Sequence, residues 1–213
     1  MSDIHPRLFL ISPIIEDADS FSVQLKKALQ GGRIDCLLLR FASKDEHELK
    51  RMVQVLAPVA QANGLAVLIE AAIDPRFAAR SGVDGMHIRY DKTALEETIE
   101  AQKPDRIVGV SGLKSRDDAM DAGELGADYL MFGEPYPDGA LPDFEAVLER
   151  ASWWAEVFST PCVAYAPSLE NITALANAHV EFIALENAVW QAPDGEEQAI
   201  KTALDMIAST IAA

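Results

Sequence analysis

The chain has 213 residues, of which 49% are hydrophobic and 24% are charged. Its 18 Lys and Arg residues are outnumbered by 34 Asp and Glu residues, so the formal net charge is −16. A protein with this charge is repelled by phosphate backbones and by anionic lipids, and we therefore expect neither nucleic acid nor a membrane as a partner.

Short apolar runs alternate with longer stretches of helical period along the chain. The runs are continuously apolar, which is typical of strands that are buried on both faces. They cover residues 8–11, 34–39, 65–69, 83–88, 106–110, 127–132, 162–166 and 180–185. The predicted helices that follow them cover residues 20–29, 45–63, 75–80, 93–101, 115–123, 143–158, 168–177 and 196–211.

This alternation of strand and helix predicts an α/β protein with a parallel sheet. Eight such units in about 200 residues match a single (β/α)8 TIM barrel, and we expect residues 1–213 to form one domain. A doubly wound open sheet is the alternative. The first turn after a strand, at residues 11–14, reads Ile-Ser-Pro-Ile and lacks a Gly-x-Gly-x-x-Gly pattern, which favours the barrel.

Three acidic residues, Asp84, Asp128 and Glu181, occupy equivalent places in the pattern. Each follows the end of a predicted helix and enters the next apolar run. The N-terminal ends of the strands are the face of a barrel that serves stability. We therefore assign these three residues to the structure and not to the site.

The remaining general features concern the cysteines, the compartment and oligomerisation. Cys36 and Cys162 lie in apolar runs and are predicted to be buried, reduced thiols.

The N-terminal residues do not have the pattern of a signal peptide, and no apolar run reaches the ~18 residues that span a bilayer. We therefore expect a cytoplasmic protein. Trp153 and Trp154 either form a contact patch for a homodimer or pack partly on the barrel.

The site of a TIM barrel is built at the C-terminal ends of its strands and in the loops that follow. This rule selects the candidate residues by strand order alone. They are Ser12, Arg40, Glu70, His87, Arg89, Asp91, Ser111, Lys114, Gly133, Glu134, Tyr136, Asp138, Tyr165, Ser168, Glu186 and Asn187.

Several candidates have two interpretations each. Arg40 follows three leucines and is predicted to project into the mouth, either as an anion clamp or as the partner of a strand-end carboxylate such as Glu70. His87 is either a general acid–base or a half-buried imidazole with a satisfied hydrogen bond. Ser111 either binds a ligand oxygen or caps the next helix. The long loop at residues 133–142 is a candidate lid.

Four segments resemble the signature stretches of the thiamine-phosphate synthases and the related TenI-like proteins. Residues 106–111 read Arg-Ile-Val-Gly-Val-Ser, and residues 126–137 read Gly-Ala-Asp-Tyr-Leu-Met-Phe-Gly-Glu-Pro-Tyr-Pro. Residues 83–87 read Val-Asp-Gly-Met-His, and residues 38–40 read Leu-Leu-Arg. The resemblance implies a (β/α)8 barrel that joins a hydroxymethylpyrimidine diphosphate to a thiazole phosphate, with Mg²⁺ and loss of pyrophosphate.

The resemblance also implies roles for residues at the mouth. Arg40 matches a pyrophosphate-binding arginine and Ser111 matches a substrate-binding serine, while Asp91 or Glu70 would hold Mg²⁺. The other substrate-binding candidates are Gly133, Tyr136, Ser168, Glu186 and Asn187. Mg²⁺ is expected as a cofactor if the family's activity is retained, and otherwise no cofactor is expected.

Some positions depart from the family's pattern. The family's Asn-Asp pair that holds Mg²⁺ would fall near residues 70–72, which read Glu-Ala-Ala here, so the pair is missing. The Gly-rich phosphate turn after the seventh strand is replaced by Ala-Pro-Ser. Pro167 lacks a backbone N–H donor, and Glu186 places a carboxylate where a phosphate would rest. Two like charges about 4 Å apart cost about 1 kcal/mol in water and several at lower dielectric. We therefore expect the coupling activity to be weak or absent.

Three alternatives remain open for the function. The first is a TenI-like isomerase or another small-ring enzyme, in which His87 or Glu134 acts as the acid–base catalyst. The second is a non-catalytic barrel that binds a small molecule at its C-terminal mouth. The third is a full synthase with an unusual metal site.

Overall fold

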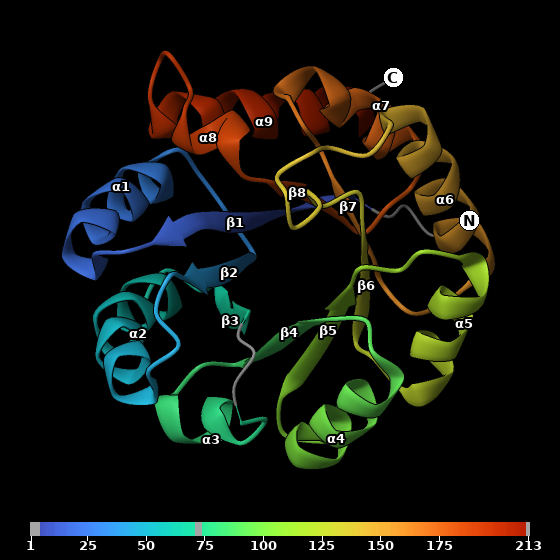
Figure 1. The fold of residues 1–213 in the computed structure, drawn as a ribbon. Coiled ribbons are helices and arrows are strands. Elements are labelled where there is room, and N and C mark those ends of the chain that lie inside the picture. The colour runs from blue at the N-terminus through green and yellow to red at the C-terminus, as the bar shows by residue number, and fades with distance from the viewer. Residues whose placement is uncertain (1–4, 71–73, 212–213) are drawn as a thin grey trace.

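The computed structural model describes residues 5–70 and 74–211. Within these residues, eight parallel strands form a closed barrel in which neighbours follow chain order and β8 pairs with β1 (Figure 1). The predicted TIM barrel is therefore confirmed. The strands are β1 (Arg7–Ile15), β2 (Cys36–Phe41), β3 (Ala66–Glu70), β4 (Gly85–Arg89), β5 (Ile107–Ser111), β6 (Tyr129–Phe132), β7 (Cys162–Tyr165) and β8 (Phe182–Leu185).

Helices surround the barrel on its outer face (Figure 1). They are α1 (Ala18–Gln30), α2 (Glu46–Gln61), α3 (Phe77–Ser81), α4 (Lys92–Gln102), α5 (Arg116–Leu125), α6 (Phe144–Val157), the 3-10 helix η1 (Leu169–Asn171), α7 (Ile172–Asn177), α8 (Asn187–Trp190) and α9 (Glu196–Ile211). The first helix begins earlier than predicted because the Asp17 carboxylate accepts the backbone N–H of Ser20 at 2.7 Å. Asp17 is thus the N-cap, in the role that this residue type favours.

The first strand is longer than the sequence pattern predicts. It continues through Ser12 and Pro13 to Ile15. Its pairing with β2 shifts register between Ile11 and Ile14, so Pro13 lies in a bulge. A bulge is one of the few places in a sheet where proline fits, because proline has no N–H for the ladder.

The short helix α8 between β8 and α9 is absent from the prediction. Four residues are too few to show a helical period in the sequence. Trp190 at its end packs edge-on against Phe21, with ring centroids 5.0 Å apart. The Trp190 indole also donates to the carbonyl of Ile11 at 2.6 Å, so α8 ties the end of β8 to β1.

Two apolar clusters fill the molecule because side chains alternate between the two faces of each strand. The larger cluster lies between the barrel and the helices and includes Leu37, Val67 and Trp154. The smaller one includes Leu38 and Leu68. Two residues further along these two strands, Arg40 and Glu70 continue the alternation. The apolar side chains of the smaller cluster therefore give way to charged side chains at the C-terminal ends of these two strands.

The predicted structural role of Asp84, Asp128 and Glu181 is confirmed. Each carboxylate lies just before a strand and reaches back to the preceding one. Each accepts a hydrogen bond at 2.7 Å from a backbone N–H near the start of that strand. The donors are Val67, Val108 and Cys162. The carboxylates thus join β3 to β4, β5 to β6 and β7 to β8.

We expect Asp84→Ala to lower the free energy of unfolding by about 2 kcal/mol, because the N–H of the buried Val67 loses its acceptor. Urea unfolding followed by circular dichroism measures this loss. Asp84→Asn keeps an acceptor oxygen and should restore most of the stability. The exposed Asp205→Ala on α9 is the matched control and should change it by less than about 0.5 kcal/mol. Equal losses in the two alanine variants would contradict the role.

Both cysteines are buried and free, as predicted. Burial raises the pKa of both thiols, so neither is an activated thiolate. Across the described ranges, none of the helices combines the length and the apolar character needed to cross a bilayer.

Candidate functional site

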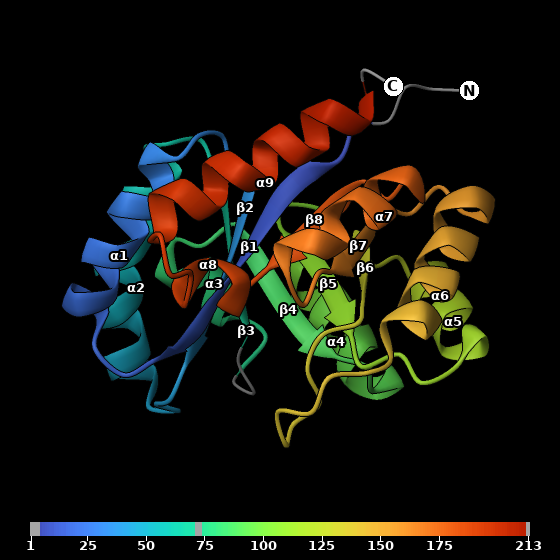
Figure 2. The ribbon, with the colours of Figure 1, turned by 90° about the horizontal axis from the view of Figure 1, so that it is seen from above.

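The C-terminal ends of the strands bring charged side chains together at one end of the barrel. Arg40 on β2 is the register partner of Glu70 on β3, and Arg89 on β4 is the partner of Ser111 on β5. Glu186 follows the last residue of β8. The loop between β6 and α6 projects beyond the strands at this end (Figure 2). The predicted mouth is therefore a single region of the structure.

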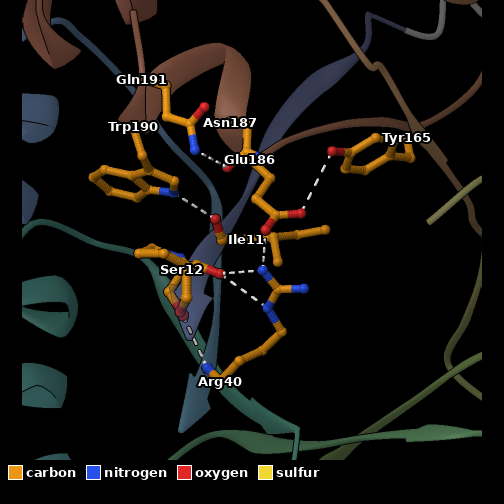
Figure 3. Close-up of polar contacts among 9 residues, drawn as sticks. Ile11, Ser12, Arg40, Tyr165, Glu186, Asn187, Trp190 and Gln191 are labelled. Carbon is orange, nitrogen blue, oxygen red and sulfur yellow. Dashed lines mark hydrogen bonds and ion pairs between the residues drawn. The ribbon is translucent and has the colours of Figure 1, made fainter. Parts of the chain in front are cut away.

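Arg40 is engaged by the protein itself at this mouth (Figure 3). Its Nη2 forms an ion pair with Oε1 of Glu186. Its Nε and Nη2 also donate to the carbonyl of Ser12, at 2.9 and 2.6 Å. The Arg40 and Glu186 side chains are only 17% and 9% exposed, so this is a largely buried pair. Of the two roles predicted for Arg40, the structure shows the ion pair, with Glu186 in place of Glu70 as the partner.

Further contacts hold this pair in position. The Ser12 hydroxyl accepts the backbone N–H of Arg40 at 2.9 Å. The Tyr165 hydroxyl is 3.4 Å from Oε2 of Glu186 and donates to it. Trp190, which fixes the adjoining carbonyl of Ile11, is not among the sequence candidates. The sequence feature that could have pointed to Trp190 is its position one helical turn after Glu186.

Glu70 lies between two guanidinium groups without a close partner in the described part of the chain. Burial raises the pKa of its carboxyl group, and the charges of Arg40 and Arg89 oppose that rise. In the described part of the chain, the Glu70 side chain is therefore open to a hydrogen bond with a ligand, as an acceptor when ionised and as a donor when protonated.

Glu134 lies on the opposite side of the mouth, after β6. Its Oε1 accepts the backbone N–H of Gly112 at 2.7 Å and lies 3.6 Å from Nη2 of Arg89. Burial raises its pKa, while the Gly112 hydrogen bond and the Arg89 charge act against the rise. A carboxyl group with a raised pKa at the mouth of a barrel is a reasonable acid–base group, so the structure keeps Glu134 as a candidate.

His87 lies inside the barrel, one layer below the charged ring. It is 2% exposed, and its Nδ1 is 2.7 Å from the Tyr129 hydroxyl. Burial and the nearby charges of Arg89 and Arg40 lower its pKa to about 3. The imidazole is neutral at pH 7 and shares a hydrogen bond with the Tyr129 hydroxyl. This geometry matches the satisfied, buried histidine and gives no support to acid–base catalysis by His87.

The candidates at β5 and in the β6–α6 loop are placed in different ways. Ser111 is buried, and its carbonyl accepts the N–H of Tyr90 at 2.7 Å. Gly133 has a φ of +91°, and a Cβ there would meet Val147 at 2.5 Å. Tyr136 is 49% exposed and lines the cavity at the mouth.

Ser168, Asn187 and Asp91 have no hydrogen bond to Arg40 or Glu186, although Asn187 follows Glu186 and lines the same cavity at the mouth. The Ser168 hydroxyl donates to Oδ1 of Asn171 at 2.9 Å. The exposed Asn187 accepts from Gln191 at 3.2 Å. Asp91 is the N-cap of α4 and accepts the N–H of Ala94 at 2.9 Å. Each of these side chains thus has a local hydrogen bond of its own.

A cavity of about 510 Å³ opens at the mouth above the Arg40–Glu186 pair. This volume is typical of small-molecule sites, which span roughly 300–1,000 Å³. Its charged lining residues are Arg40, Lys44, Glu70, Arg89 and Glu186, and its apolar ones include Ile14, Phe41, Leu49 and Pro135. A mixed lining of this kind suits a small polar ring better than a wholly apolar molecule.

A separate cavity of about 480 Å³ lies beside η1 and α8. Ser168 and Asn187 both line it, so the structure brings these two candidates together there. Asp194 is its one charged lining residue among those that the structure describes. With no cation and with Pro167 in its wall, this cavity is poorly suited to a phosphate.

The carboxylates at the mouth do not form a metal site. Within residues 5–70 and 74–211, no three His, Cys, Asp or Glu side chains are grouped so that they could hold an ion. Glu186 pairs with Arg40, Glu134 accepts a backbone N–H, and Asp91 caps α4. Ala71 and Ala72 lie outside the described residues, but neither carries a metal-binding side chain. The donor set therefore does not fit a magnesium ion.

The family model and the curated relatives agree on one family. A family model described as thiamine monophosphate synthase matches residues 8–189. The curated thiamine-phosphate synthase of Rhodospirillum centenum is 37% identical over 196 residues, covering 91% of this chain and 94% of that protein. The thiamine-phosphate synthase of Erythrobacter litoralis is 33% identical over 219 residues, covering 100% of this chain and 98% of that protein.

Solved structures show the same fold at lower sequence identity. Thiamine phosphate pyrophosphorylase from Pyrococcus furiosus has a TM-score of 0.78 at 22% identity, and the match covers 98% of each chain. The 3-keto-L-gulonate-6-phosphate decarboxylase of Vibrio cholerae has a TM-score of 0.73 at 11% identity, covering 96% of this chain and 99% of the other. At these identities the structures are evidence for the barrel alone.

Proposed function

This chain belongs to the thiamine monophosphate synthase family, and from that premise we propose that its barrel mouth binds a small heterocyclic ligand while its capacity for diphosphate coupling is weak or absent. The ligand occupies the cavity of about 510 Å³ above the Arg40–Glu186 pair. Glu70 and the side chains of the β6–α6 loop supply polar and apolar contacts to it.

The ion pair between Arg40 and Glu186 is the observation that carries this proposal. The resemblance gives Arg40 the role of binding pyrophosphate. In this chain a carboxylate already occupies the guanidinium, together with the Ser12 carbonyl. An incoming diphosphate would have to displace Glu186 and would then lie close to an unpaired negative charge. Both effects weaken the binding of a polyanion.

The residues at the mouth also fail to provide the magnesium site that the resemblance implies. Glu186, Glu134 and Asp91 are engaged by an arginine, a backbone N–H group and a helix N-terminus, which leaves Glu70, in the described part of the chain, without a second carboxylate to share an ion. A metal ion would offset the repulsion between diphosphate and the acidic mouth, so its ligands matter for coupling. We therefore derive no step of a reaction through Mg²⁺ for this chain.

Synthase activity is the second candidate, because relatives at 37% and 33% identity carry the name thiamine-phosphate synthase. An isomerase-type activity on a small ring is a third, supported by the raised pKa of the partly buried Glu134 carboxyl group at the mouth. Ligand binding is common to all three. Product formation separates them.

We expect the pyrimidine alcohol or the thiazole alcohol, each added without phosphate, to raise the melting temperature by several degrees, because a bound ligand stabilises the folded state. Differential scanning fluorimetry measures this shift. Incubation of hydroxymethylpyrimidine diphosphate with thiazole phosphate and Mg²⁺ should give no thiamine phosphate above the blank. Phe41→Ala, which opens the apolar wall of the cavity, should reduce the shift. Coupling at a normal enzymatic rate would overturn the proposal.

A further inference from the structure

Besides the cavity beside η1 and α8, a cavity of about 500 Å³ adjoins the first one at the barrel mouth. We call it the second cavity. It lies at the ends of β4, β5 and β6 and extends to α6. The two cavities share Arg89, Tyr136 and Pro137, so the β6–α6 loop stands between them. One small molecule can therefore extend from one cavity into the other.

The second cavity collects positive charge in a chain whose formal net charge is −16. Arg89, Lys114 and Arg150 line it, and Glu134 is the one acidic residue of its described lining. Three cations against one carboxylate leave a formal charge of +2 when Glu134 is ionised. The cavity beside η1 and α8 has no cation among its described lining residues. The described lining of the first cavity has three cations against two carboxylates, so the largest net positive charge of the three cavities lies on the β5–β6 side.

These cations keep donors available for a ligand. Arg150 uses Nη1 to donate to the carbonyl of Leu113 at 3.1 Å, which leaves most of its five N–H groups. Lys114 has no ion pair with any residue in the described ranges. The carboxylate of Glu134 already accepts the backbone N–H of Gly112 and faces Arg89. It therefore neutralises Arg89 in part but leaves the other two cations.

Nearby carboxylates outside the lining are also occupied. Asp118 accepts the backbone N–H groups of Lys114 and Ser115, at 2.9 and 3.0 Å. Asp121 is held by Lys92 and by the Tyr90 hydroxyl, at 2.8 and 2.6 Å. These acids therefore do not turn toward Lys114 or Arg150 as ion-pair partners, and the excess of positive charge persists in the cavity.

We propose that this β5–β6 cavity is an oxyanion site, which takes the carboxylate or phosphate group of the small ligand whose ring lies in the first cavity. Lys114 and Arg150 are its anion-binding residues. Met131, Phe132 and Pro142 form apolar walls, which strengthen charge-assisted hydrogen bonds by lowering the local dielectric. The identity of the ring rests on the proposed function, whereas binding of the anion can be measured without any ring.

Isothermal titration with inorganic phosphate and with acetate, at constant ionic strength in chloride, tests the site. We expect at least one of the two anions to bind the wild-type protein with one-to-one stoichiometry. Lys114→Met and Arg150→Leu should each weaken its Kd about tenfold, the size of one charge-assisted hydrogen bond. Lys26→Met on α1, on the opposite side of the barrel from α5 (Figure 1), is the matched control and should bind as the wild type does.

The variants separate loss of binding from loss of structure. Arg150 holds the Leu113 carbonyl, so Arg150→Leu also perturbs the loop after β5. Lys114 has no such contact through its side chain, so Lys114→Met carries the decision. Binding of neither anion to the wild type, or unchanged Kd in Lys114→Met, overturns the site. If a ring alcohol still stabilises the protein in that case, the proposed function stands and only this inference fails.

Discussion

Replacing Glu186 by Leu is expected to lower the free energy of unfolding by about 3 kcal/mol, because it leaves the buried charge of Arg40 without its partner. Arg40→Leu should cost a similar amount for the same reason. The double variant Arg40→Leu/Glu186→Leu should lie close to the wild type, since an apolar pair of similar volume often replaces a buried ion pair without loss. Urea unfolding of the four proteins forms a double-mutant cycle.

The cycle has a clear contrary outcome. If the two single losses add in the double variant, the side chains are not coupled and the ion pair does not hold the mouth together. Glu186→Gln is the conservative control, because it keeps an acceptor for Arg40 and removes only the charge. It should lose less stability than Glu186→Leu. It should also bind inorganic diphosphate more tightly than the wild type, since the guanidinium is then released from a competing carboxylate.

The second large effect concerns pH. The pKa of His87 falls to about 3 in the folded protein, against an ordinary value of 6.5. Below pH 6.5 the unfolded chain therefore binds a proton that the folded chain does not, and stability falls as the pH falls. We expect this group alone to remove about 2 kcal/mol between pH 7 and pH 5, and about 3 kcal/mol by pH 4. Urea unfolding at these pH values measures the loss.

The variant His87→Gln isolates this contribution. Glutamine cannot take up a proton in this range but can still form a hydrogen bond with the Tyr129 hydroxyl, as donor or as acceptor. Glu70 and Glu134 have raised pKa values, so they contribute in the opposite sense and favour the folded state as the pH falls. They are present in both proteins and cancel in the difference. Parallel pH profiles for the wild type and His87→Gln would show that His87 is not buried as a neutral group.

The barrel could be predicted from the sequence because burial on both faces leaves a continuous apolar run for every strand. The bulge at Pro13 and the four-residue helix α8 could not. The Ser12-Pro13 pair interrupts the apolar run, because proline cannot donate to the ladder of a strand. Only the pairing with β2 shows that β1 continues beyond it. A helix of a single turn has no period to detect. Both features lie where β1 meets its neighbours.

The candidate site was predicted in its position but not in its pairing. Strand order places Arg40 and Glu186 at the same end of the barrel. Their contact joins residues 146 positions apart, and it depends on barrel closure, which brings β2 and β8 to the two sides of β1. The continuous apolar runs also hide which side chains face inward, so they do not separate the buried His87 from the mouth residue Arg89. The contribution of Arg150 to the second cavity was missed because α6 carries it and strand ends do not.

The contacts that join neighbouring strands differ in their distance along the chain. The carboxylates of Asp84, Asp128 and Glu181 close loops of only 17, 20 and 19 residues. Loops of this length close at small entropic cost, so three strand pairs are held by local contacts. The junction of β8 with β1 has its backbone ladder, to which Arg40, Glu186 and Trp190 add side-chain contacts between residues far apart in the chain. A ligand that separates Arg40 from Glu186 breaks one of these contacts as it binds, and its apparent affinity is lowered by the free energy of that contact.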